Sequence, residues 1–113
     1  MTLLILKHFF CDFPLQGPYM YKNKGTYGHP GGLLHAGVHV AGTFLCVAVF
    51  SPAWATAMAL FDGVIHYHVD WAKMKTCASL NLKPDNSESF WILLGLDQLL
   101  HYMTYVLIVA LMF

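Results

Sequence analysis

The chain of 113 residues is 58% hydrophobic and only 11% charged, with no arginine and a net charge of zero. A charged fraction this far below the quarter or so usual in soluble domains, with a mean hydropathy of +0.55, is typical of a membrane protein. The balanced charge excludes a basic nucleic-acid-binding surface, so we expect no nucleic-acid partner. Cys11, Cys46 and Cys77 are far apart and form no CxxC motif, which indicates free thiols rather than disulfides or a thiolate zinc site.

Four apolar segments predict an all-α fold. The first, Leu3 to Phe13, would be about 16 Å long as a helix, roughly half of a bilayer. We therefore expect a short half-spanning, interfacial or re-entrant helix that ends before Pro14. After a loop rich in glycine, tyrosine and proline, Leu33 to Phe50 is apolar enough for a first full span. A very short connection follows, so Ala53 to Trp71 is predicted to return antiparallel beside that span.

A polar loop from Lys75 to Ser89 precedes the last apolar segment. Phe90 to Phe113 is long enough to cross a bilayer with tilt, and Ser87 is a candidate N-cap for it. The prediction is a single transmembrane domain, residues 1–113, built as a helical bundle of four helices with three full spans and a short N-terminal helix.

Histidine and aspartate residues recur at i, i+4 spacing within these segments. Seven histidines and five aspartates placed at random would give roughly one such pair, given the helical reach of about four residues, whereas five are present. Residues four apart lie on one face of a helix, and ionisable groups in apolar helices normally face the bundle interior and mark functional sites. The pairs are His8 with Asp12, His35 with His39, Asp62 with His66, His66 with Asp70, and Asp97 with His101.

The expected topology brings these pairs toward one membrane face. Pairs near the C-termini of the first and third segments meet pairs toward the N-termini of the second and fourth. Most lysines lie in the loops at that end, and none lies in the turn at Ser51 and Pro52. The positive-inside rule makes this face cytoplasmic, so we expect a multi-pass protein of the inner membrane with its site on the cytoplasmic side and both chain ends opposite. Lys7 is the exception and is expected to snorkel to the interface.

Imidazole and carboxylate groups are the ligands that zinc, manganese and non-haem iron prefer, and helical bundles build such centres from facing helices. We expect a divalent metal, zinc first, with manganese or iron as alternatives. One catalytic zinc needs only three or four protein ligands, so the larger set here predicts two metals, or one metal with supporting groups. The candidate ligands are His8, Asp12, His35, His39, Asp62, His66, Asp70, Asp97 and His101.

Three of these carboxylates, Asp12, Asp70 and Asp97, are also the candidate catalytic residues, as ligands or as the base for a metal-bound water whose pKa is lowered toward neutrality. Two histidines are expected outside the site. His29 lies in a loop, and His68 lies about 200° around the helix from His66. Gln98 and Thr104 are candidate hydrogen-bond partners between helices.

Four blocks in order, KHFFCDFPLQ, LLHAGVHV, HYHVDWAK and LDQLLHY, resemble a family of small His/Asp-rich polytopic membrane proteins of bacteria and their viruses, known as a domain of unknown function. The resemblance covers nearly the whole chain. More distantly, the arrangement is similar to membrane-bound proteins assigned as metal-dependent hydrolases, which implies hydrolysis without naming a substrate. The resemblance carries over to every candidate ligand except Asp62, which lies outside the blocks.

The residues leave two functions open. The first is a metal-dependent hydrolase acting on a lipid-linked or headgroup substrate. The alternative is a non-enzymatic, phage-type envelope protein that binds or modulates a host membrane complex, with the His/Asp cluster as a structural polar network. Polar groups do not continue toward the far face, which disfavours a proton or ion pathway. The short first helix favours a homo-oligomer that seals the cluster from lipid.

Overall fold

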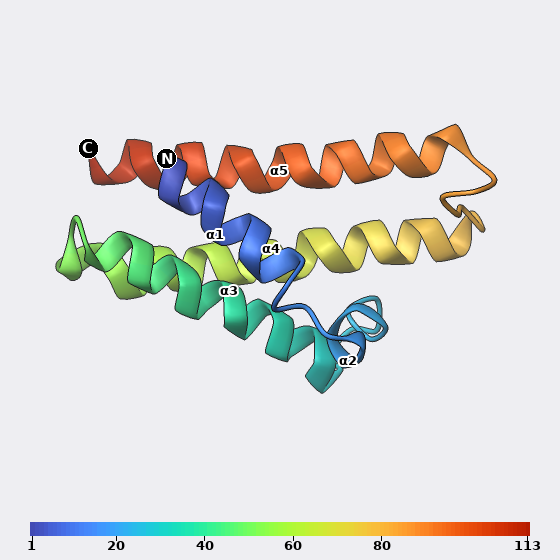
Figure 1. Cartoon of the computed structure of the whole chain (residues 1–113), viewed down its shortest axis with the longest axis horizontal. Helices are drawn as coiled ribbons and strands as arrows, with labels where there is room; N and C mark the ends of the chain where they lie inside the picture. Colours follow the sequence, from blue (N-terminus) through green and yellow to red (C-terminus); the bar gives the residue numbers. More distant parts are fainter.

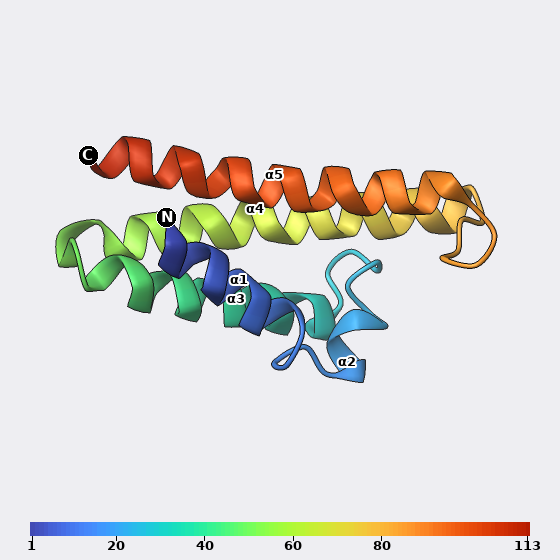
Figure 2. The ribbon, with the colours of Figure 1, turned by 45° about the horizontal axis from the view of Figure 1, so that its top comes forward.

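The computed structural model describes residues 1–113 and contains five helices and no strand, which confirms the all-α prediction. Three long helices, α3 (Pro30–Ala48), α4 (Pro52–Ser79) and α5 (Glu88–Met112), run antiparallel in chain order (Figure 1). Helix α1 (Thr2–Asp12) crosses them and contacts α3 and α5. The short α2 (Pro18–Tyr21) lies in the loop before α3, and the α4–α5 hairpin extends beyond it (Figure 2).

Proline and capping residues set most of the helix starts. Pro30 and Pro52 are the first residues of α3 and α4, where the missing N–H group costs nothing and the fixed φ suits the helix. The Ser87 side chain accepts a hydrogen bond from the backbone N–H of Ser89, which confirms Ser87 as the N-cap of α5.

Helix α4 is longer than its apolar run predicted. It continues past Trp71 to Ser79, through residues expected to begin a loop. Polarity alone does not end a helix, and this stretch contains no glycine or proline to do so. The helix ends just before Asn81, whose positive φ of 50° is the left-handed conformation usual after a helix C-terminus.

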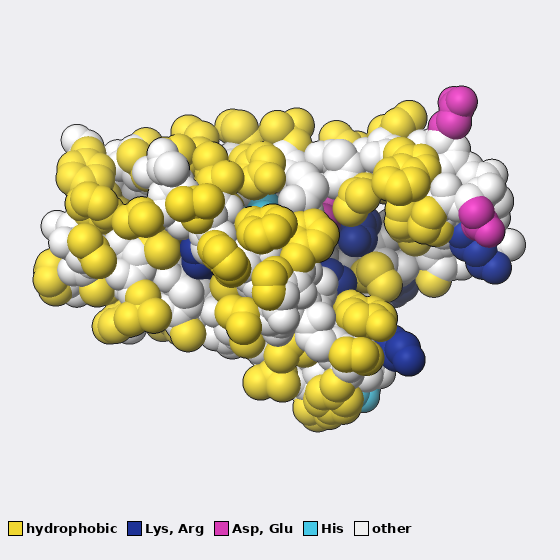
Figure 3. Space-filling view, viewed as in Figure 1, with side chains coloured by type: hydrophobic (Ala, Val, Ile, Leu, Met, Phe, Trp, Pro, Cys, Tyr) yellow, Lys and Arg dark blue, Asp and Glu magenta, His cyan; other side chains and the backbone are white.

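Two helices, α3 and α5, are long and apolar enough to cross a membrane. The expected third span, within α4, is not among them, because charged, histidine and aromatic side chains lower the hydropathy of every stretch of that helix long enough to cross. The interior nevertheless buries thirteen polar or charged side chains against eleven apolar ones. Large apolar side chains cover much of the outer surface instead (Figure 3). An apolar exterior around an ionisable interior is the distribution that a lipid environment favours.

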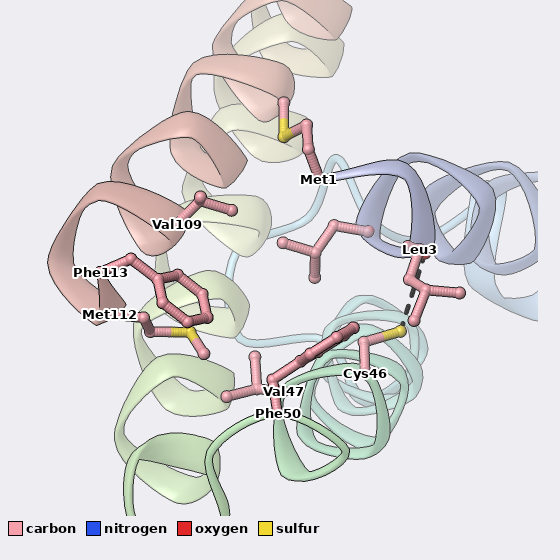
Figure 4. A pocket seen from close by; sticks show the side chains of 9 residues that line it. Met1, Leu3, Cys46, Val47, Phe50, Val109, Met112 and Phe113 are labelled. Carbon is pink, nitrogen blue, oxygen red and sulfur yellow. Dashed lines mark hydrogen bonds between the residues drawn. The ribbon is translucent and has the colours of Figure 1, made fainter.

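The two ends of the bundle differ. Both chain termini lie at one end (Figure 1), as predicted, and the apolar core is there, formed by Leu4, Val47, Ala55, Met58, Tyr105 and Ile108. Beside it, nine apolar residues from α1, α3, α5 and their ends line a pocket of about 130 Å³ (Figure 4). The other end carries the loops with Lys22, Lys24 and Lys83, and the C-terminal turns of α4 with Lys73 and Lys75.

Candidate metal centre

Side chains from α1, α3, α4 and α5 meet in the middle of the bundle. Every one of the nine predicted ligands is buried, with at most 7% of its surface exposed. The polar face of each long helix therefore turns toward the interior of the bundle.

These side chains form three overlapping groups, and within each group the potential ligand atoms lie within 4.8 Å of one another. We call them the first, central and third groups. The first group is His8, Asp12, His39 and His66; the central group is Asp12, His35, His66 and Asp70; the third group is Asp70, Asp97 and His101.

The central group has the dimensions of a coordination shell. His35 Nε2 lies 3.1 Å from His66 Nε2 and 3.2 Å from Asp70 Oδ2, and His66 Nε2 lies 3.3 Å from the same oxygen. Asp12 Oδ1 lies 3.2 Å from His35 Nε2 and 3.6 Å from His66 Nε2. Zinc bonds to nitrogen and oxygen of about 2.0–2.1 Å in a tetrahedron imply ligand separations of about 3.3 Å. These four atoms therefore stand close to the spacing that one tetrahedral cation requires.

Two carboxylates link the three groups. Asp12 directs Oδ1 to the central group, while its Oδ2 lies 3.1 Å from His8 Nε2. Asp70 directs Oδ2 to the central group, while its Oδ1 lies 3.3 Å from His101 Nε2. A carboxylate that offers one oxygen to each of two neighbouring sites suits a centre with two metals.

His39 has a different environment from the other imidazoles. Its Nδ1 lies 3.1 Å from the ammonium nitrogen of Lys7, which can only donate a hydrogen bond. A neutral His39 then carries its proton on Nε2 and donates it to Asp12 Oδ1 at 2.9 Å. In this arrangement His39 orients the Asp12 carboxylate rather than offering a lone pair to a cation.

Asp62 lies outside all three groups, contrary to the prediction from its spacing. Its Oδ2 accepts hydrogen bonds from Lys7 Nζ at 2.8 Å and from the Thr43 hydroxyl. Asp62 is on the expected face of α4 but one turn farther along, about 6 Å from the level of His66. The prediction that Lys7 snorkels is also wrong, because its side chain points inward to this carboxylate.

Two further lysines border the third group. Lys24, from the loop before α3, places Nζ 3.0 Å from Asp70 Oδ2, and Lys73 on α4 places Nζ 3.9 Å from Asp97 Oδ2. From the sequence, both lysines were expected in or beside the loops, as positive charges of the cytoplasmic face. Only the folded loop shows that Lys24 is buried.

The remaining polar residues are placed largely as expected. The His29 side chain caps α3, and His68 bonds Tyr27 on the exposed side of α4, so both lie outside the site. Gln98 connects α5 to α1, because its Oε1 accepts a hydrogen bond from His8 Nε2 at 3.0 Å, while its amide nitrogen donates to the neighbouring Asp97. Thr104 instead donates to the backbone of its own helix at Leu100, because that carbonyl is one turn away.

The donor atoms of the three groups are imidazole nitrogens and carboxylate oxygens, a set that suits zinc, manganese or iron. The nearby Cys11 thiol is buried, but it points to the Val38 carbonyl and joins none of these groups.

Comparison with known proteins places the chain in a family. No curated protein and no solved structure matches it. The model of a family described as "Protein of unknown function (DUF3307)" matches residues 1–113. The chain therefore belongs to the DUF3307 family.

Proposed function

We propose that this protein is a membrane-embedded, metal-dependent hydrolase that acts on a lipid-linked or headgroup substrate. The observation that carries the proposal is the central group, in which four buried donor atoms from three helices have the mutual distances of one cation's ligands. Burying this many ionisable groups in a small apolar bundle is costly, and a shared divalent cation offsets that cost.

The residues divide into three roles. Asp12, His35, His66 and Asp70 hold the cation of the central group, and His101 offers a ligand to a second position beside Asp70. A divalent cation supplies a Lewis acid and lowers the pKa of water. Asp97 Oδ1 is buried, has no hydrogen-bond partner and lies 3.5 Å from His101 Nε2, and we assign it as the acceptor of the proton of an attacking water.

The surroundings support a membrane-bound substrate. Helices α3 and α5 are apolar enough to span a bilayer, and we propose that α4 spans with them, its charges sheltered between its neighbours. A groove of about 350 Å³ between α4 and α5 has walls of leucine, valine and alanine, and Asp97 lines it. The lysine-rich loops at this end favour the cytoplasmic side.

A metal-content measurement on two matched variants tests the proposal. Because His66 belongs to two groups, His66→Gln should remove most of the zinc or manganese that purified protein retains in detergent. His68→Gln, two residues away on the exposed side, should retain it. Equal metal content in both variants, or none in the wild-type protein, would reject the metal centre.

Hydrolysis is tested separately with wild-type protein and Asp97→Asn in mixed micelles that contain labelled phospholipid. The expected result is metal-dependent release of a water-soluble headgroup by the wild-type protein. Asp97→Asn should release about 10²–10⁴-fold less, the usual contribution of a positioned proton acceptor. Equal release by the two proteins would reject the role of Asp97.

A purely structural network is the second candidate function, as in an envelope protein that modulates a membrane complex. The observation that favours it is that carboxylate oxygens lie 2.9–3.6 Å from the Nε2 atoms of His35, His39 and His66. These contacts join helices without a cation. The Nδ1 atoms of His35, His66 and His101 have no hydrogen-bond partner, so each of these rings makes its polar contacts through Nε2 alone.

A further inference from the structure

Lys24 and Lys73 stand on either side of the third group. An unbroken series of close contacts runs from Lys24 through Asp70, His101 and Asp97 to Lys73, with separations of 3.0, 3.3, 3.5 and 3.9 Å. The lysines come from different segments, a loop and α4, and their ammonium groups stand at the two ends of this series, one beside Asp70 and the other beside Asp97. Lysine and acidic side chains are visible in the hollow between α5 and the α2 region (Figure 3).

The loop that carries Lys24 is held firmly in place. A Cβ atom on Gly32 would lie 3.1 Å from Lys24 Cα, so the loop packs directly on the first turn of α3. The backbone N–H of Gly28, at a positive φ of 79°, donates to the Tyr67 hydroxyl on α4 at 2.6 Å. Lys24 is therefore buried by the course of the loop, and its position at Asp70 is built into the fold.

Lys73 lies where the site opens. It lines the groove between α4 and α5 together with Asp97 and the apolar side chains Leu93, Leu96 and Leu100. A molecule in this groove would have an apolar body along the leucines and its polar end between Lys73 and the third group.

The charges of the site require an anion once a cation is present. Asp12, Asp70 and Asp97 supply three negative charges, and Lys24 and Lys73 supply two positive ones. With one divalent cation added, these groups carry a net charge of +1, and with two divalent cations they carry a net charge of +3. Buried charge without a counter-ion is strongly unfavourable, so a loaded site favours an anionic ligand.

We propose that Lys24 and Lys73 bind a phosphate group of the substrate. The inference rests on the proposed metal centre. Lys24 shares Asp70 Oδ2 with His35 and His66, so if that oxygen held a cation, the Lys24 ammonium would be available to a phosphate oxygen. A lysine ammonium is a common ligand of phosphate.

Calorimetric binding to detergent-solubilised protein tests the inference with two probes, inorganic phosphate and dihexanoyl phosphatidic acid. Metal content is measured first. Metal-loaded wild-type protein should bind at least one probe tenfold or more tightly than metal-free protein. Lys24→Met and Lys73→Met should each weaken that binding by about tenfold, the size of one charge-assisted hydrogen bond, with metal content unchanged. The exposed lysines provide matched controls, and Lys22→Met and Lys75→Met should bind as the wild type does.

The two probes separate the sources of the phosphate. Tighter binding of the lipid assigns the α4–α5 groove to an acyl chain, whereas equal binding assigns the site to free phosphate. Metal-loaded protein that binds neither probe, or lysine variants that bind as the wild type does, would overturn this inference and leave the metal centre standing. A wild-type protein without metal would overturn both. If one lysine variant does not fold, the other variant decides, with the same expected tenfold loss of phosphate binding.

Discussion

Lys7 directs all three of its ammonium protons to buried acceptors, namely Asp62 Oδ2, the Tyr105 hydroxyl and His39 Nδ1. An ammonium has three donors and no acceptor, so its hydrogen-bonding capacity is filled within the bundle. The acceptors lie on α3, α4 and α5, while Lys7 lies on α1. This one side chain therefore fixes how the short first helix docks on the other three.

Removal of either partner of this ion pair should destabilise the protein more than removal of both. Lys7→Met leaves the Asp62 carboxylate buried without a counter-ion, a change that typically costs about 3–5 kcal/mol. Replacement of the pair by apolar residues, Lys7→Met with Asp62→Leu, should recover most of that loss. Unfolding by sodium dodecyl sulfate in mixed micelles, followed by circular dichroism, measures the free energy of unfolding of the single and the double variant. Equal destabilisation by the single and double variants would contradict the pairing.

At the residue scale, spacing predicted the histidines and aspartates of the site because it reports the face of a helix on which a side chain lies. His66 and Asp70 had to point the same way once α4 was helical. The same spacing argument also placed Asp62 among the ligands. It could not exclude Asp62, because spacing gives the face of the helix but not which residue of a neighbouring helix lies opposite each turn. Lys24 could not be predicted, because its position depends on loop contacts at Gly28 and Gly32 rather than on any periodic pattern.

The helices pack closely where a glycine leaves room for a neighbour. A Cβ atom on Gly63 of α4 would clash with Val40 Cγ2 of α3 and lie 3.8 Å from the Ala36 carbonyl oxygen. Small residues at such crossings let helix backbones approach, which is the usual means of packing in membranes. Gly63 lies three residues from His66, so this contact sets the distance between α3 and α4 at the central group.

Gly63→Ala should therefore separate α3 from α4, destabilise the fold by about 1–3 kcal/mol as overpacked sites do, and lower metal content. Gly95→Ala on α5 is the matched control, because nothing lies within 4 Å of its Cβ position and alanine favours a helix. Unfolding in mixed micelles and metal analysis of both variants make the comparison. A Gly63→Ala protein as stable and as rich in metal as Gly95→Ala would show that α3 and α4 do not depend on this contact.

At the scale of elements, apolar runs predicted where helices exist better than where they end. The first helix follows its apolar run closely, since Pro14 lies just beyond it. Helix α4 passes beyond its apolar run, because a helix can continue through polar residues, and this one ends only just before Asn81. Helix α2 is a single turn beginning at Pro18, and its sequence carries no hydrophobic period to reveal it.

The whole molecule is organised along its long axis. An apolar core and an apolar pocket occupy one end, the ionisable centre lies in the middle, and lysine-bearing loops occupy the other end. Polar groups do not continue through the apolar end. In the proposed membrane setting this polarity would favour a site reached from a single membrane surface over a path across the bilayer.

Binding of a cation at the centre should stabilise the whole bundle, because its ligands come from α1, α3, α4 and α5. A ligand that binds only the folded state adds about 2.7 kcal/mol to the free energy of unfolding at a concentration one hundred times its Kd. Thermal unfolding of wild-type protein should therefore shift upward with zinc or manganese and return on chelation, while His66→Gln should show no shift. A structural network without metal predicts the same unfolding temperature with and without chelator, because its imidazole–carboxylate contacts need no cation. The presence or absence of this shift in unfolding temperature thus distinguishes a centre that holds a metal from a cluster that only joins helices.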